Sequence, residues 1–172
     1  IDALDDSAWD ASIWLSVVDA PIITDNNIER AADGASWFVS TVKNDQKVTS
    51  AKWMTAGLGV FQLYLNGKIV GAEVLKPGFT DPFKTKLSFT YDITDAFQCK
   101  AGAENVLAAQ VTPGWWGDKI VTPGGNKGTY GTKCAFRGVL ELTYADGTTK
   151  LYGTDLENWK AGIAGPVKHA AI

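Results

Sequence analysis

At 172 residues, with 45% hydrophobic and 20% charged residues, the chain has the size and composition of one globular domain. Its formal net charge is −3 and its lysines are scattered singly, which argues against nucleic acid or an anionic membrane surface as a partner, because phosphate groups require a concentrated basic face. No apolar run reaches the roughly 18 residues of a membrane-spanning helix. We therefore expect neither a nucleic-acid nor a membrane partner.

The first 34 residues are the least regular part of the sequence. Residues 7–16, SAWDASIWLS, predict a short strand or an extended edge. Residues 21–35 predict a loop, since Pro, Asp, Asn and Gly cluster there without a sustained period. Residues 37–43, WFVSTVK, alternate β-branched positions and predict a strand.

Strands and tight turns dominate the middle of the chain. Residues 48–67 predict two strands with a break at 57–59, followed by an Asn66-Gly67 turn, the strongest short hairpin signal. Residues 86–93 place apolar residues at every second position, which predicts a strand with one packed and one polar face.

The last third begins with a short helical signal. Residues 94–104 predict a one-turn helix capped by Thr94 or Asp95 and ended by Gly102. A buried strand is predicted over 105–112, and 113–132 is rich in Gly and Pro, so it predicts a long loop. A hairpin with an Asp146-Gly147 turn follows.

Short strands separated by turn signals predict an antiparallel all-β sandwich. Trp159 is expected to fill its core. We expect one domain over residues 1–172, with an irregular leading part over 1–34 and a regular part over 35–166. The ending PVKHAAI suggests a chain cut from a longer protein.

The sequence offers no catalytic constellation. A glycoside hydrolase needs two carboxylates aimed at one bond, yet the acidic residues mostly occupy turn positions, where an aspartate commonly bonds its own backbone. His169 is the single histidine and lies near the end of the chain. The turn aspartates are Asp81, Asp92, Asp95, Asp146 and Asp155. We therefore expect no enzymatic activity from this chain alone.

Trp115 and Trp116, followed by Asp118, mark the long loop as a candidate sugar-binding site. An indole face can stack on a sugar ring while a carboxylate accepts hydrogen bonds from its hydroxyls. The same tryptophans could instead dock a neighbouring domain or fill the core. Asn66 and Glu73 complete the candidate sugar contacts.

Two further clusters leave alternatives open. Asp25, Asn26 and Asn27 offer oxygen ligands that suit calcium, although they equally suit an ordinary turn. Cys99 and Cys134 lie in no metal-binding spacing, so zinc is disfavoured, and they could form a disulfide or stay as free thiols.

Several motifs in combination resemble the amino-terminal β-sandwich domain of bacterial alpha-L-rhamnosidases. They include GVFQLYLNGKIVG, VLKPGFTD, SFTYDITDAF, GAENVLAAQV, PGWWGDK and GVLELTYADGT. The resemblance runs from about residue 35 to 166.

The resemblance implies a jelly-roll sandwich of the galactose-binding-like type that precedes an α/α-barrel catalytic domain, in a bacterial extracytoplasmic enzyme. It implies a non-catalytic accessory domain. Such a domain binds L-rhamnose-containing glycans, in some relatives with calcium, or packs on the catalytic barrel, or is purely structural. Ala72 stands where the family often has Asp or Asn, which weakens any site that depends on that side chain.

Overall fold

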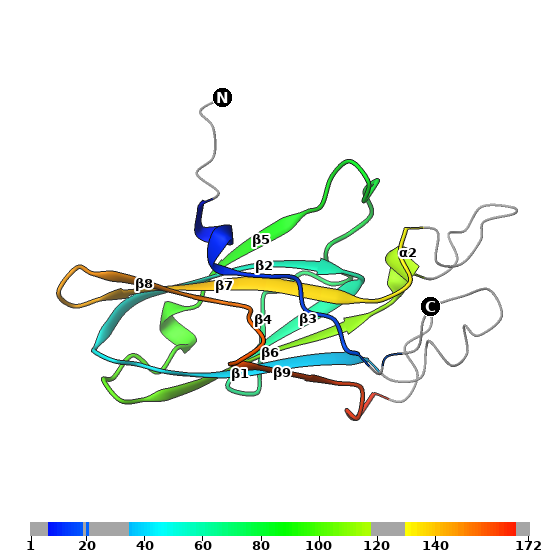
Figure 1. The fold of residues 1–172 in the computed structure, drawn as a ribbon. Helices are drawn as coiled ribbons and strands as arrows, with labels where there is room; N and C mark the ends of the chain where they lie inside the picture. The colour runs from blue at the N-terminus through cyan, green and yellow to red at the C-terminus, as the bar shows by residue number, and fades with distance from the viewer. Residues whose placement is uncertain (1–6, 19, 21–34, 118–129, 168–172) are drawn as a thin grey trace, which may run out of the picture.

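The protein is a sandwich of two antiparallel β-sheets (Figure 1). The computed structural model describes residues 7–18, 20, 35–117 and 130–167. In this part of the chain, one sheet has the strand order β4-β3-β6-β1-β9 and the other has the order β5-β2-β7-β8. The strands are β1 Ser36–Lys43, β2 Val48–Leu58, β3 Val60–Leu65, β4 Lys68–Val70, β5 Ser88–Asp92, β6 Glu104–Thr112, β7 Ala135–Tyr144, β8 Thr149–Gly153 and β9 Trp159–Gly162. The predicted all-β sandwich is confirmed.

Alternation of apolar residues builds the core between the sheets. In β3, Phe61, Leu63 and Leu65 are buried, while the residues between them are half-buried. Phe136 of β7 packs against Phe38 of the opposite sheet, with ring centroids 5.8 Å apart. Fully burying one such side chain contributes roughly 1.5–3 kcal/mol, so this contact is a main stabiliser of the sandwich.

Both predicted hairpins are present. Asn66 and Gly67 have φ angles of 51° and 79° and join β3 to β4, as expected for a turn that needs two left-handed residues. Gly147, with φ of 85°, lies in the turn between β7 and β8. The predicted break between β2 and β3 is Gly59, where an added Cβ would lie 2.3 Å from the carbonyl oxygen of Thr112.

The amino-terminal segment differs from its prediction as a strand or extended edge. Within residues 7–18 it contains a 3₁₀ helix, η1 (Ser7–Ala11), and Leu15 alone of these residues pairs in a β-bridge, with Phe136. Arg137 holds this segment, because its guanidinium donates to the Ser12 hydroxyl at 2.9 Å and to the carbonyl of Trp9. Such side-chain contacts from a distant strand leave no trace in local periodicity.

Two other local predictions were wrong in detail. The helix after β5 is the 3₁₀ helix η2 (Thr94–Ala96), and its N-cap is Ile93, not Thr94 or Asp95. The Asp92 carboxylate instead accepts from the Thr94 amide at 3.0 Å. The long loop after β6 opens with one helical turn, α2 (Gly114–Gly117).

Four of the five turn aspartates bond their own backbone, as predicted. Asp81, Asp92, Asp146 and Asp155 each accept a hydrogen bond from the amide two residues further on. Hydrogen bonds from Thr94 and Thr148 lower the pKa of Asp92 and Asp146, respectively. These carboxylates therefore stabilise turns as charged groups. Asp95 lies within η2.

The two thiols are free, so the disulfide alternative is excluded. Cys134 is buried and Cys99 half-buried. Trp159 is half-buried and packs against Phe136 at 5.7 Å between ring centroids. Within the described ranges, no helix is long and apolar enough to cross a membrane.

Candidate functional site

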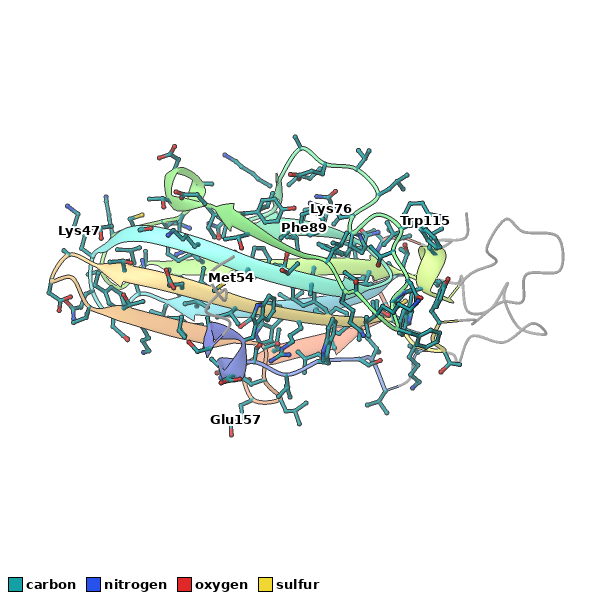
Figure 2. All side chains as sticks on the ribbon, turned by 90° about the horizontal axis from the view of Figure 1, so that it is seen from above. Lys47, Met54, Lys76, Phe89, Trp115 and Glu157 are labelled. Atoms are coloured by element: carbon teal, nitrogen blue, oxygen red, sulfur yellow. The ribbon has the colours of Figure 1, made fainter. Side chains whose placement is uncertain are left out.

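One end of the sandwich carries a group of aromatic and aliphatic side chains that we call the aromatic end surface. Figure 2 shows Trp115 at this end and Lys47 at the opposite end. The side chains of Phe79 and Phe83 are 55% and 71% exposed. The surface consists of Phe79, Phe83 and Leu87 from the connection between β4 and β5, Trp115 from α2, and Tyr130.

Tyr130 holds the exposed phenylalanines in place. Its ring centroid lies 6.3 Å from that of Phe79 and 5.4 Å from that of Phe83, both in edge-to-face orientation. Such pairs contribute about 0.5–1.5 kcal/mol beyond the area they bury. The rings therefore form one cluster rather than separate exposed side chains.

The connection that presents Phe79 and Phe83 is held by its own hydrogen bonds. The Asp81 carboxylate accepts from the amide of Phe83 at 3.1 Å, and the Thr80 hydroxyl donates to the carbonyl of Thr85 at 2.8 Å. Lys86 donates to the carbonyl of Pro82 at 2.8 Å. The loop closes on itself through these polar contacts, so its phenylalanines face outward.

The adjacent tryptophans have different roles. The indole N–H of Trp116 donates to the carbonyl of Lys133 at 2.8 Å, and its ring lies against the backbone of Gly131, where an added Cβ would approach to 2.0 Å. Trp116 therefore anchors the end of the long connection, just before β7. Trp115 is half-buried and lines the hollow beside Phe79.

That hollow is small and apolar. It measures about 40 Å³ and its walls include Leu58, Pro77, Phe79, Leu87 and Trp115. A single water needs roughly 10–15 Å³ of such space, so the hollow holds a few waters and no sugar ring. A ligand at this end would have to lie on the surface.

The same connection contains a buried lysine, Lys76, for which no sequence pattern is a signal. Lys76 is only 2% exposed, and its ammonium donates to the carbonyl of Val70 at 3.1 Å. The ammonium also lies 5.0 Å from the ring centroid of Tyr91. Burial lowers the pKa of Lys76, and the charge of Glu73 opposes this shift.

Glu73 and Tyr91 belong to this cluster. The Tyr91 hydroxyl donates to the Glu73 carboxylate at 3.3 Å. Burial and the neighbouring Glu73 charge raise the pKa of Tyr91 to about 12. Glu73 is exposed, yet its carboxylate already has a tyrosine partner and a nearby ammonium.

The structure brings only some of the predicted site residues together. Trp115 and Trp116 share the aromatic end. Asn66 follows the last residue of β3, at the end of the strand away from the aromatic end. Val60 pairs with Thr112, next to α2, whereas Leu65 pairs with Leu107. The length of β3 separates these two ends by about 17 Å.

Other predicted ligands are outside the described residues, namely Asp118, Asp25, Asn26 and Asn27. Across 7–18, 20, 35–117 and 130–167, no group of three or more His, Cys, Asp or Glu side chains is placed to hold a metal ion.

Sequence comparison finds relatives of one kind. A family model described as the alpha-L-rhamnosidase N-terminal domain matches residues 46–172. An alpha-L-rhamnosidase of Streptomyces avermitilis is 38% identical over 127 residues, which are 74% of this chain and 12% of that protein. An alpha-L-rhamnosidase of Alteromonas sp. is 33% identical over 128 residues, covering 74% of this chain and 13% of that protein.

Solved structures agree. A crystal structure of an alpha-L-rhamnosidase from Aspergillus terreus matches with a TM-score of 0.82 and 26% identity, covering 95% of this chain and 18% of that one. The Streptomyces avermitilis alpha-L-rhamnosidase complexed with L-rhamnose matches with a TM-score of 0.70 and 32% identity, covering 80% and 13%. The chain thus spans 12–18% of the length of these relatives and belongs to the alpha-L-rhamnosidase N-terminal domain family.

Proposed function

We propose that this chain is a non-catalytic accessory domain of an alpha-L-rhamnosidase and that its aromatic end surface docks onto another part of the same enzyme. The observation that carries the proposal is the exposure of Phe79 and Phe83. Contiguous exposed apolar side chains commonly mark interaction sites. Val74 and Leu75, 83% and 53% exposed, extend the apolar character along the same connection.

The lack of catalysis rests on the placement of the carboxylates. Four aspartates accept hydrogen bonds within their own turns, and Glu73 is bonded to Tyr91. Hydrolysis of a glycosidic bond needs an acid and a second carboxylate facing each other across the substrate. The much greater length of the relatives leaves room for catalysis elsewhere in such an enzyme.

We also assign the sandwich to the jelly-roll, galactose-binding-like class. The support is its connectivity, since the chain passes from one sheet to the other at most of its strand connections.

The docking proposal is tested in the full-length enzyme that contains this domain. Phe79→Ser with Phe83→Ser should lower the melting temperature of the 172-residue chain by only a few degrees, because both side chains are exposed and the loss is limited to their ring contacts with Tyr130. The same changes should lower the melting temperature of the whole enzyme by clearly more than that of the isolated chain. Leu156→Ser is the matched control, since Leu156 is 81% exposed and lies between β8 and β9, outside this surface. The proposal would be removed if the double variant lowered the melting temperature of the whole enzyme no more than that of the isolated chain, or no more than the control does.

Carbohydrate binding at the same end is the second candidate function. Its support is the exposed ring of Phe83 and the ring of Tyr130 beside it, on which a rhamnose-containing glycan could stack. Calcium bound by Asp25, Asn26 and Asn27 would belong to this function. Calorimetry with L-rhamnose, with and without calcium, tests it, and flat heats at millimolar sugar would exclude it.

A further inference from the structure

A larger hollow, which we call the edge cleft, opens between the two sheets at the side formed by β1 and β8. It measures about 410 Å³, which is within the roughly 300–1,000 Å³ of ligand pockets in proteins. It is about tenfold larger than the hollow beside Trp115. None of the residues predicted from the sequence to bind sugar lines it.

The cleft exists because the edge strand β8 faces a part of β1 that the short edge strand β9 does not cover. β9 pairs with β1 only over residues 37–40, and β8 is the last strand of its own sheet. Within the described part of the chain, no strand pairs with residues 41–43 of β1 on the side away from β6. Backbone groups on that side are therefore available to a ligand.

The floor of the cleft is apolar, and its walls carry aromatic and polar side chains, among them the charged Lys43. Val42, Leu107 and Leu140 are buried residues that line its base. Tyr152 of β8 and Trp159 of β9 supply one ring from each sheet. The Trp159 indole N–H donates to the carbonyl of Gly153 at 3.2 Å, which fixes this wall before any ligand arrives.

The segment that crosses from β8 to β9 adds polar groups to the cleft. Asp155 accepts from the amides of Glu157 and Asn158 through one oxygen and from the Asn158 side chain through the other. Burial opposes ionisation, but these hydrogen bonds outweigh it, so the pKa of Asp155 lies below its ordinary value. A backbone hydrogen bond from Trp159 also lowers this pKa. With about four acceptor positions on a carboxylate, Asp155 is saturated by its own turn, and its role is to hold the Asn158 side chain at the cleft.

We propose that the edge cleft binds one neutral hexopyranose ring, a function separate from docking at the aromatic end. A pyranose has an apolar face and a rim of hydroxyls, which matches an apolar floor between two aromatic rings with Asp155 and Asn158 at one end. An added peptide strand fits less well, because β1 leaves only residues 41–43 open, and strand addition depends on a run of main-chain hydrogen bonds.

Titration of the ¹⁵N-labelled chain with L-rhamnose, L-fucose and D-galactose, followed by amide NMR shifts, tests the proposal. At least one sugar should shift the amides of residues 41–43, residues 151–153 and Asn158 together with the Trp159 indole, with millimolar affinity. Shifts confined to Trp115, Trp116 and Phe83 would overturn it in favour of the aromatic end. No shifts with any of the three sugars would overturn it outright.

Substitutions then localise the binding. Asn158→Ala should weaken it about fivefold or more, because the amide lines the cleft. Glu157→Ala is the matched control, since Glu157 precedes Asn158 but does not line the cleft and projects away from the sandwich (Figure 2). Equal affinities for the two variants would contradict the assignment of the site.

Discussion

The side-chain amide of Asn66 donates to the side-chain oxygen of Asn105 at 3.0 Å, which joins the β3–β4 turn to β6. The Asn66 oxygen accepts from the amide of Val106 at 2.8 Å. Asn105 is fully buried and also exchanges hydrogen bonds with the backbone of Gln98. Asn66 is therefore occupied by contacts that hold the turn and the strand together.

Asn105→Ala should lower the free energy of unfolding by about 1–3 kcal/mol, because the Gln98 amide and the Asn66 side-chain amide lose their acceptor. The Gln98 carbonyl keeps a partner, since it also accepts from Asn44. Asn66→Ala should cost about 1–2 kcal/mol, since it loses the amide contacts and places alanine at a left-handed φ. Urea unfolding measures both. Asn66→Gly is the control for the backbone contribution and should cost less than Asn66→Ala. A double variant whose cost equals the sum of the single costs would contradict direct coupling.

Asn66 also shows which part of the site could be foreseen. Asn66-Gly67 predicts its turn correctly because turn chemistry is local. Its distance from Trp115 depends on the antiparallel register of β3 and β6, which a sequence pattern does not supply. Trp115 and Trp116 were placed together because they are neighbours in the chain. Even so, their different roles depend on Gly131 and Lys133, which lie at the far end of the same connection, just before β7.

Most strands were predictable for the same local reason, since alternation with period two needs no tertiary information. Lys76 and the edge cleft were not. Lys76, in the β4–β5 connection, lies against the rings of Phe61 from β3 and Tyr91 from β5. The cleft arises because β9 is short, and a strand's length relative to its neighbour is a property of the assembled sheet.

Gly131→Ala should destabilise the protein by about 1–3 kcal/mol, the usual cost of overpacking. The new methyl group would lie 2.0 Å from the Trp116 ring, so the indole must move. This movement lengthens the hydrogen bond from the indole N–H to the carbonyl of Lys133. Gly162→Ala is the matched control, because nothing lies within 4 Å of an added Cβ there. Thermal unfolding compares them, and equal melting temperatures would show that Trp116 does not pack on Gly131 in solution.

The two cysteines should differ in reactivity. Burial raises the pKa of Cys134 to about 12, and the thiolate is the reactive form. Burial and the charge of Asp95 also raise the pKa of Cys99, although this residue is half-buried. At pH 8 a thiol reagent should therefore modify Cys99 slowly and Cys134 only after denaturation. Mass spectrometry of the modified chain identifies the site, with Cys99→Ser as the control. Rapid modification of Cys134 in the folded protein would contradict its burial.

Lys76 should make stability depend on pH near the alkaline end. Burial lowers its pKa below the ordinary 10.5, so the folded protein holds this proton less tightly than the unfolded chain does. At pH values between the lowered pKa of folded Lys76 and the ordinary 10.5, the unfolded chain binds more protons than the folded protein. The contribution of Lys76 to the free energy of unfolding therefore rises with pH. Lys76→Met keeps the aliphatic stem without the amine and should change the free energy of unfolding by less than about 1.5 kcal/mol at pH 7.

Comparing the wild type with Lys76→Met separates the titration of Lys76 from that of the other lysines and the tyrosines. As pH rises toward 10.5, the difference in free energy of unfolding should shift in favour of the wild type, because only the wild type can lose the buried charge. Lys68→Met, at an exposed position of β4, should show no such shift. Urea unfolding at several pH values measures all three. Parallel curves for wild type and Lys76→Met would mean that Lys76 titrates like a solvent-exposed amine, in conflict with its burial beneath Phe61 and Tyr91.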